Sequence, residues 1–521
     1  MGVYLNPGNV DFQEVLNSKI YVDKSELIQY TNSVLRTTQK YICVSRPRRF
    51  GKSMAANMLT AYYSRGCDSR EMFQGLKIAK HTDFEKHLNQ YNVIHLNMRD
   101  YLTESENMKQ LIQFVEEDLL DELQQEFADL RMPRRRTLVK VLEQAFAQYK
   151  IPFVFIIDEW DCIFRVHKSD AASQKTYLDF LRNLLKDKSY IALAYMTGIL
   201  PIKKYGEHSA INAFYEYSMT DASPIEEFTG FTEQEVRRLC EQYQMPFTET
   251  KKWYDGYCVD GVSIYNPKSV VEAMLRGKFS NYWTKTETYE ALKVYIDLNQ
   301  DGLRDKIVQM IAGEKVPVNP DKFQNDMTTL HSADDVLTLL VHLGYLTYDE
   351  QNRVVWIPNG EVRQEFINSI EDGGWEPVVQ AIRSSERLLQ ATLSGDAETV
   401  AELIEQAHQA NASILKYNDE NALSCVISLA YYSAQKNYTL HREMPAGKGF
   451  ADIVFEPNRN CDLPALIVEL KWGHSAEEAV EQIKQKDYLD CLKNYSGEVL
   501  LVGVNYDKEK RHTCRIERAV I

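Results

Sequence analysis

Short apolar runs alternate with longer amphipathic stretches over about the first 220 residues of the chain. The apolar runs predict strands at residues 41–44, 92–98, 153–157, 191–196 and 214–219. Between these runs, helical periodicity predicts helices at residues 54–63, 108–130 and 137–149. A further short strand followed by a helix is predicted at residues 21–30. This alternation is typical of an α/β fold with a doubly wound parallel sheet and right-handed crossovers.

One predicted strand leads directly into a loop with the parts that phosphate binding needs. The stretch YICVSRPRRFGKS (residues 41–53) runs through a polar loop to Gly51, Lys52 and Ser53, and a helical pattern follows. A phosphate requires backbone NH groups, a positive helix end and an ammonium group. In G-x-x-x-x-G-K-[ST] the first glycine would fall at position 46, where this chain has Arg46, so the tail G-K-S alone is a weak signal. The candidate nucleotide-binding residues here are Arg46, Pro47, Arg48, Arg49, Phe50, Gly51, Lys52, Ser53 and Met54.

Two acids follow the most apolar strand of this series. Asp158 and Glu159 come directly after five large apolar residues, a run typical of a strand buried on both faces. Open α/β sheets bind ligands at this end of their strands. We expect Asp158 and Ser53 to hold Mg²⁺, and Glu159 to polarise the water that attacks the γ-phosphate. The alternative is a strand followed by a capped turn.

Thr197 lies at the end of the next predicted strand, beside the acidic one. It is a candidate sensor of the γ-phosphate, and the alternative is that it only caps the turn. Arg131 and the run 134–136 lie between two predicted helices, where a solvated connection is favoured over a phosphate or partner contact. Arg165, Arg182 and the run 134–136 are candidate arginine fingers, and the sequence does not distinguish among them.

The middle of the chain predicts a helical lid and then a winged-helix-like unit. In the lid, an aromatic turn at residues 253–257 would suggest base stacking if exposed, but core packing is favoured. The lid helices are predicted at residues 232–244 and 267–276. The following unit predicts a helix at 334–343, strands at 345–348 and 353–357, and a helix at 360–370.

Winged-helix units bind DNA when the recognition helix and the wing are basic. Here Asp334, Asp335, Asp349 and Glu350 make the unit acidic, so protein packing is favoured over DNA binding. A helical linker is predicted to follow, with Gly373 and Gly374 as a candidate hinge.

Two apolar strands near the C-terminus carry a second group of charged residues. GFADIVF contains Asp452, and ALIVELKW contains Glu469 and Lys471, which share a strand face. Antiparallel pairing of the strands would bring Asp452 beside Glu469. Burial of such groups costs several kcal/mol unless something uses them. Mg²⁺ held by Asp452 and Glu469, with Lys471 orienting or deprotonating the attacking water, would use them, and the alternative is a salt-bridged hairpin.

Composition places the chain among folded proteins. Its 521 residues predict two to four domains, with 44% hydrophobic and 26% charged residues. The net charge of −15 disfavours a protein that coats nucleic acid by charge alone, although a local basic groove is compatible with it. Nine scattered cysteines favour a reducing compartment. No signal-peptide pattern or membrane span is predicted, so the cytoplasm is the expected location.

The first half of the chain resembles the bacterial predicted AAA-ATPase-like family. The resemblance rests on YVDKSELI, RPRRFGKS, FIIDEWD, TGILPIKK, FTEQEV, KKWYDGY and YNPKSVV. It implies that arginine in place of the first glycine is a family trait. It also implies an AAA-related P-loop fold with an additional strand between the loop strand and the acidic strand.

The C-terminal residues resemble the PD-(D/E)xK nuclease superfamily, with its restriction-endonuclease-like α/β fold. The order Asp452, Glu469, Lys471 carries the resemblance, with Ala451 where proline is often found. Glu420 matches the preceding helical acid of that family, and Gln482 with Tyr488 matches its downstream helix. The resemblance implies catalytic roles for Glu420 and Gln482.

The expected domains are an ATPase core at 1–225, a lid at 226–300, a winged-helix-like unit at 301–372, a linker at 373–410 and a nuclease-like domain at 411–521. The hypothesis is an ATPase whose nucleotide state controls a Mg²⁺-dependent nuclease acting on DNA, in defence or DNA processing. Lys52 would neutralise the β- and γ-phosphates. The alternatives are a nucleotide-dependent signalling or scaffold protein, and a protein that binds ATP without hydrolysing it. The sequence leaves homo-oligomerisation open.

Overall fold

The computed structural model describes eleven segments of the chain, and these form two compact units. The described residues are 2–202, 212–283, 290–298, 301–323, 330–373, 375–411, 420–446, 449–458, 461–492, 495–506 and 511–520. The first unit comprises Met1–Lys285 and Pro317–Val362. The second unit comprises Thr286–Val316 and Arg363–Ile521.

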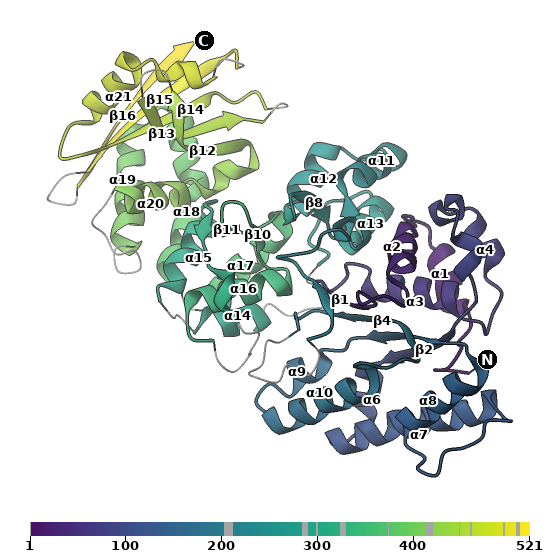
Figure 1. Ribbon diagram of the computed structural model, residues 1–521. Helices are drawn as coiled ribbons and strands as arrows, with labels where there is room; N and C mark the ends of the chain where they lie inside the picture. The colour runs from purple at the N-terminus through teal and green to yellow at the C-terminus, as the bar shows by residue number, and fades with distance from the viewer. Residues whose placement is uncertain are drawn as a thin grey trace. The chain divides into compact units, whose positions relative to one another are not determined.

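A parallel five-stranded sheet forms the centre of the first unit (Figure 1). Its strands are β1 (Tyr41–Ser45), β2 (Asn92–Asn97), β3 (Phe153–Asp158), β4 (Ile191–Gly198) and β5 (Tyr215–Tyr217). Their order is β2-β3-β4-β1-β5, and every neighbouring pair is parallel. The expected additional strand is confirmed, because β4 lies between the loop strand β1 and the acidic strand β3.

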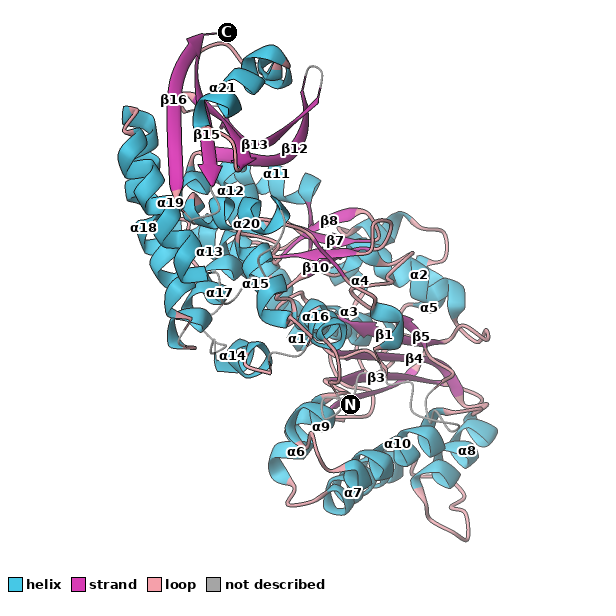
Figure 2. Ribbon diagram, turned by 90° about the vertical axis from the view of Figure 1, so that its left-hand side faces the viewer, coloured by secondary structure: helices cyan, strands magenta, loops and turns pink. Residues whose placement is uncertain are grey.

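Helices cover both faces of this sheet, which makes it doubly wound (Figure 2). One face carries α1 (Val10–Leu16), α2 (Glu26–Val34), α3 (Lys52–Tyr63), α4 (Arg70–Gln74) and α5 (Phe84–His87). The other carries α6 (Met98–Glu104), α7 (Met108–Glu126), α8 (Leu138–Tyr149), α9 (Cys162–Val166) and α10 (Ala171–Leu185).

The strand expected near residue 21 is absent from the structure, and that expectation was wrong. Residues 21–24 form no strand, and α2 follows them. The Asp23 carboxylate accepts hydrogen bonds from the backbone NH groups of Ser25 (2.9 Å) and Lys77 (2.7 Å). A side chain that satisfies nearby backbone groups in this way replaces a strand ladder.

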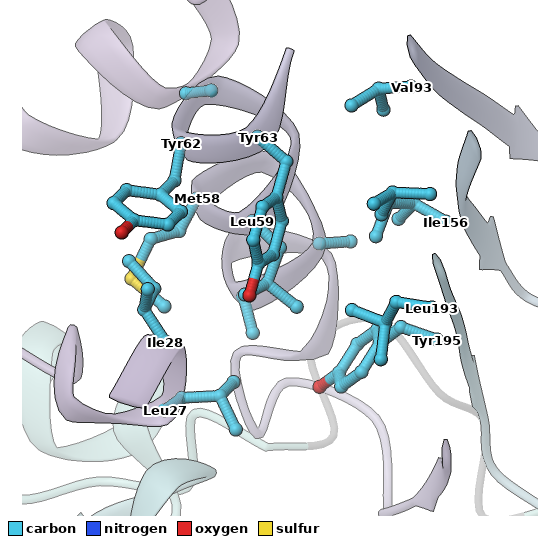
Figure 3. Close-up of a cluster of buried hydrophobic side chains, with 14 of the residues drawn as sticks. Leu27, Ile28, Met58, Leu59, Tyr62, Tyr63, Val93, Ile156, Leu193 and Tyr195 are labelled. Carbon is cyan, nitrogen blue, oxygen red and sulfur yellow. The ribbon is translucent and has the colours of Figure 1, made fainter. Parts of the chain in front are cut away.

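Helix α3, which begins at Lys52, packs its apolar side against α2 and the sheet (Figure 3). Figure 3 shows Met58, Leu59 and Tyr63 of α3 beside Ile28 of α2 and Ile156 of the sheet. The Tyr63 hydroxyl donates to Asn32 Oδ1 (2.8 Å), and the Tyr62 hydroxyl donates to the Phe84 carbonyl (2.6 Å). Because these buried hydroxyls have partners, the core fixes α3 and therefore the helix end that follows the loop.

The segment predicted as a lid contains a small sheet as well as the predicted helices. Its helices are α11 (Glu233–Tyr243), α12 (Phe247–Tyr254) and α13 (Pro267–Arg276). Its strands are β6 (Phe231–Thr232), β7 (Tyr257–Val259) and β8 (Val262–Tyr265), in the antiparallel order β6-β8-β7. Thr232 and Glu235 form a capping box that starts α11. Tyr254 and Tyr257 are buried, which confirms that the aromatic turn packs into the core.

The predicted order of helix, hairpin and helix is confirmed in the next segment. It consists of α16 (Ala333–Leu343), β10 (Thr347–Asp349), β11 (Val354–Trp356) and α17 (Gly360–Asp372), with β9 (Val316–Pro317) beside β11. Nearly every side chain of α16 is buried, including the polar Thr338 and His342. The α16 side chains that are not buried include Asp334 and Asp335, which would repel DNA phosphates, and this supports the protein-packing interpretation. The division between the two units falls within α17, after Val362.

The second unit contains helices around a mixed five-stranded sheet. Its strands are β12 (Tyr438–Ala446), β13 (Gly449–Pro457), β14 (Ala465–Trp472), β15 (Glu498–Tyr506) and β16 (His512–Val520), in sequence order. Only β14 and β15 pair in parallel among these described strands. Its helices are α14 (Glu290–Ile296), α15 (Leu303–Ile311), α18 (Glu376–Ser394), α19 (Ala397–Asn411), α20 (Glu420–Ala430) and α21 (Ala476–Gln485).

Of the two candidate hinge glycines, Gly373 follows α17, and Gly374 lies outside the described residues. Within the described segments, no helix is both long enough and apolar enough to cross a membrane.

Candidate functional site

The candidate phosphate loop leaves β1 and enters α3 at the carboxyl edge of the central sheet. Its backbone is left-handed at Arg49 (φ +69°) and at Gly51 (φ +85°), which directs the chain tightly into the helix. Lys52 is the first residue of α3, and its ammonium group donates to the carbonyls of Arg46 and Pro47, both at 2.9 Å. Ser53 and Met54 follow on the exposed side of the first turn. The loop, the lysine and the helix end therefore converge as a phosphate site requires.

Arg46 is buried, and its guanidinium group contacts protein carbonyls. Nη1 donates to the carbonyls of Ser45 (3.0 Å) and Tyr217 (2.8 Å), where β1 and β5 end. Burial lowers the pKa of Arg46 to about 10, so the side chain still carries its charge at neutral pH. The side chain of Arg46 therefore joins two strand ends, and the part of this residue nearest the loop site is its backbone.

The predicted acidic residues lie beside the loop. Burial lowers the pKa of Lys52, and the charges of Glu159 and Asp158 oppose that shift. The Thr197 hydroxyl donates to Asp158 Oδ1, which also accepts the backbone NH of Glu159 (2.9 Å). The structure thus brings together the loop, both acids and Thr197, with Thr197 as a hydrogen-bond partner of Asp158.

Glu159 is held by an arginine whose role the sequence left undecided. Arg165 Nη2 forms an ion pair with Glu159, and Arg165 Nε donates to Asp161 Oδ2 (3.1 Å). Asp161 is fully buried and accepts the backbone NH groups of Ile199 (3.0 Å) and Leu200 (2.8 Å). The backbone of Glu159 is left-handed (φ +54°). The spacing of Asp161 and Arg165, one helical turn apart, was the only sequence signal for this network.

The second site lies where β13 and β14 separate. Their antiparallel register pairs Ile453 with Val468, so the next residues, Asp452 and Glu469, lie side by side. Asp452 Oδ2 accepts the backbone NH of Leu470 (2.7 Å). Lys471 Nζ lies 3.5 Å from Glu469 Oε1. The predicted pairing of the two strands is confirmed.

Gln482 on α21 completes this cluster. Its amide donates to Glu469 Oε1 and, at 3.3 Å, to the hydroxyl of Tyr488. Tyr488 opens a short 3₁₀ turn after α21. Glu420 begins α20, but its side chain lies outside the described residues.

Glu469 has the chemistry of a metal ligand. Its side chain is buried, and Oε2 has no hydrogen-bond partner. Burial raises the pKa of the Glu469 carboxyl, and the neighbouring Asp452 raises it further, while Lys471 lowers it. A divalent cation would satisfy the unpartnered oxygen and relieve the repulsion between the two carboxylates.

The donor set of this cluster fits magnesium. Within the described residues, no group of three or more His, Cys, Asp or Glu side chains is arranged to hold a metal. Mg²⁺ commonly binds through one or two carboxylates and keeps several waters. Asp452 and Glu469 would therefore suffice to hold it.

Comparisons with known proteins identify two domains in the chain. Residues 8–206 match the family model described as predicted AAA-ATPase, and residues 418–516 match a model of the PD-(D/E)XK nuclease superfamily. The chain joins an AAA-ATPase-like domain to a PD-(D/E)XK nuclease-superfamily domain. Both resemblances seen in the sequence are confirmed, as is the α/β P-loop class of the first domain.

One curated relative, "Uncharacterized protein in vnfD 5'region" of Azotobacter chroococcum mcd 1, is 23% identical over 498 residues, or 90% of each chain. The ORC2 protein of Aeropyrum pernix, solved in ADPNP–ADP complexes, is 11% identical and has a TM-score of 0.29, covering 68% of this chain and 97% of its own. AMPPCP-bound DnaA from Aquifex aeolicus is 8% identical with a TM-score of 0.25, covering 68% and 90%. These two structural likenesses are too weak to carry an argument.

The buried position of Arg46 leads to a stability prediction. Arg46→Gly removes a buried side chain and leaves two carbonyls without their donor, so we expect a loss of about 2–5 kcal/mol in the free energy of unfolding. Arg46→Met restores most of the volume without the donor, and we expect an intermediate loss. Urea unfolding monitored by circular dichroism measures both. Equal stability of Arg46→Gly and the wild type would show that the guanidinium contacts contribute nothing.

Proposed function

We propose that the first unit binds and hydrolyses ATP, and that its nucleotide state controls a Mg²⁺-dependent nuclease in the second unit that acts on DNA. The observation that carries the proposal is the buried Glu469, with an unpartnered oxygen, beside Asp452, Lys471 and Gln482. A salt-bridged hairpin would not need a second carboxylate or an orphaned oxygen. The cluster is therefore better explained as a catalytic site than as a structural one.

In the nucleotide site, each group has a distinct role in the proposal. The ammonium group of Lys52 exchanges its two loop carbonyls for phosphate oxygens, and the start of α3 supplies backbone NH groups. Ser53 and Asp158 would hold the magnesium of the nucleotide. Glu159 would orient the attacking water, and Arg165 positions its carboxylate.

In the nuclease site, Asp452 and Glu469 would hold Mg²⁺, which when bound stabilises negative charge on the scissile phosphate. Lys471 faces Glu469 and would orient the attacking water or accept its proton. Gln482 donates to Glu469 and so fixes the direction in which its second oxygen points. Glu420 would supply a further carboxylate from α20.

A scaffold function is the second candidate, in which nucleotide binding changes a partner surface and the C-terminal domain does not cut. The net charge of −15 and the buried α16 favour it, because neither suits a surface that binds DNA extensively. Superfamily membership does not by itself guarantee activity. The proposal includes a role in DNA processing or defence, a cytoplasmic location and self-association.

Paired substitutions in the two units test the proposed function. We expect Lys471→Ala to reduce cleavage of DNA by at least about 100-fold, since it removes the group beside the metal ligands. We expect Lys52→Ala to leave the nuclease site intact and to abolish the effect of ATP on cleavage. The measurement is cleavage of single-stranded DNA, double-stranded DNA and RNA by the full chain, with Mg²⁺ and with or without ATP.

Lys484→Ala is the matched control for Lys471→Ala, because Lys484 is an exposed lysine on α21 that pairs with Glu517. It should cleave like the wild type. Cleavage that survives Lys471→Ala at the wild-type rate would exclude the nuclease mechanism. A wild-type chain that binds ATP but cuts no nucleic acid would favour the scaffold function.

Metal binding in the second unit should depend on pH. Because the pKa of Glu469 is raised, its carboxyl retains a proton to higher pH than usual, and a metal must displace that proton. We therefore expect Mn²⁺ to raise the melting temperature more at pH 8 than at pH 6. Thermal unfolding with and without Mn²⁺ measures this. Asp452→Asn should remove the metal effect, and an unchanged effect in that variant would place the metal elsewhere.

Hydrolysis separates an ATPase from a protein that only binds ATP. We expect Glu159→Gln to slow single-turnover hydrolysis by about 100-fold or more, because the amide cannot act as a base. Its affinity for ATP should stay within about threefold of the wild type, since the isostere preserves the shape of the site. Equal single-turnover rates in the two proteins would remove Glu159 from catalysis.

A further inference from the structure

Arg49 of the phosphate loop is bonded to the lid. Its Nη1 donates to the carbonyls of Tyr282 and Trp283, both at 3.1 Å. Tyr282 and Trp283 are buried residues that follow α13. Although Arg49 lies only two residues before Gly51 and has a left-handed backbone, its charged group faces the lid carbonyls. A residue of the candidate phosphate loop therefore binds another part of the unit.

The same turn of the lid is held from its other side by Glu361. Glu361 Oε1 accepts the backbone NH groups of Tyr282 (2.5 Å) and Trp283 (2.9 Å). The peptide group between Tyr282 and Trp283 thus accepts from Arg49 through its carbonyl and donates to Glu361 through its NH. Hydrogen bonds on both sides of one peptide polarise each other, and Arg49 and Glu361 also attract each other by charge.

Other residues of the loop make contacts of the same kind. A Cβ atom on Gly344, at the end of α16, would lie 2.7 Å from Pro47 Cβ, so glycine is needed for this close approach. The Phe50 ring packs edge-on against Tyr257, with ring centroids 5.2 Å apart. The Tyr257 hydroxyl in turn donates to the Gly344 carbonyl (2.9 Å). Pro47, Arg49 and Phe50 of the loop therefore contact the lid segment and the end of α16.

We propose that Arg49 is a nucleotide-responsive latch, which binds the Tyr282–Trp283 turn when no nucleotide is present and turns to the phosphates of bound ATP. The inference rests on the proposed ATP-binding function and adds a regulatory residue to the same site. Phosphate oxygens carry full charge, and an arginine bonds to them more strongly than to neutral carbonyls. Bound ATP therefore competes with the Tyr282 and Trp283 carbonyls for the Arg49 guanidinium group. When Arg49 leaves these carbonyls, the turn that Glu361 also binds is held less firmly.

Glu361 connects this event to the rest of the chain. It lies in the first turn of α17, and α17 is one continuous helix that passes from the first unit into the second. A change in how the Tyr282–Trp283 turn is held therefore acts on the first turn of that helix. The latch supplies the nucleotide-dependent step that control of the second unit requires.

Opposite effects of two substitutions on ATP affinity test the latch. Arg49→Ala removes a phosphate ligand, and we expect it to weaken binding of a non-hydrolysable ATP analogue about tenfold. Glu361→Gln weakens the hold of the lid on Arg49, and we expect it to tighten binding about three- to tenfold. Burial raises the pKa of Glu361 to about 7, so glutamine imitates a protonated form that the fold already accommodates. Calorimetric titration of the full chain measures both affinities.

The double variant Arg49→Ala/Glu361→Gln should bind the analogue like Arg49→Ala alone, within about twofold, because the glutamate acts only through the arginine. Glu272→Gln is the matched control, since it removes a lid carboxylate that pairs with Lys268 and Arg276. It should leave the affinity unchanged. A Glu361→Gln variant that binds more weakly than the wild type, or that keeps its effect without Arg49, would overturn the latch.

Hydrogen exchange gives a second measurement that needs no change at Glu361. In the wild type, the analogue should accelerate exchange of the Tyr282 and Trp283 amides, and in Arg49→Ala it should not. Unchanged or slower exchange in the wild type would overturn the latch. Failure of the proposed function gives a different result. In that case the wild-type chain does not bind the analogue, or the Lys52→Ala variant binds it as well as the wild type, and there is no ATP site at Lys52 to regulate.

Discussion

The burial of Arg46 is the constraint on which the nucleotide site depends. Its guanidinium joins the Ser45 and Tyr217 carbonyls, where β1 and β5 end, and its own carbonyl accepts a hydrogen bond from Lys52. One residue therefore joins two strand ends with its side chain and holds the Lys52 ammonium group with its backbone carbonyl. A glycine at position 46 could hold Lys52 with its backbone carbonyl, but it has no side chain to join the two strand ends. The residue that departs from the usual phosphate-loop pattern is thus an added support for the loop, and the pattern alone could not show this.

The main strands were predictable because a parallel strand covered on both faces must be a continuous apolar run. Strands β3 and β4 begin at the residues that the sequence indicated, and the position of a strand between β1 and β3 followed from the family resemblance. The lid sheet was not predictable, since β6 has only two residues and β7 only three. Strands this short show no alternation. The strand predicted before α2 does not form for another reason. The Asp23 side chain binds nearby backbone NH groups and so replaces the strand hydrogen bonds that its apolar neighbours suggested.

The two candidate sites were predictable to the extent that their residues are near in sequence or on paired strands. Glu469 and Lys471 share a strand face, and an antiparallel partner brings Asp452 to them. The contact between Arg49 and Tyr282 was not predictable, because the two residues are 233 positions apart and no periodicity connects them. Only the fold shows that the arginine of one segment and the glutamate of another hold the same peptide group.

The two sites manage their negative charge in opposite ways. In the first unit, Arg165 pairs with both Glu159 and Asp161, so these acids have a cation within the protein. In the second unit, burial raises the pKa of Glu469, and the neighbouring Asp452 carboxylate raises it further, although Lys471 opposes the rise. A site of the first kind can persist without a ligand, whereas a site of the second kind is relieved by a bound cation. The second unit should therefore bind a divalent metal without any other ligand. The first site should bind a divalent metal only together with the phosphates of the nucleotide.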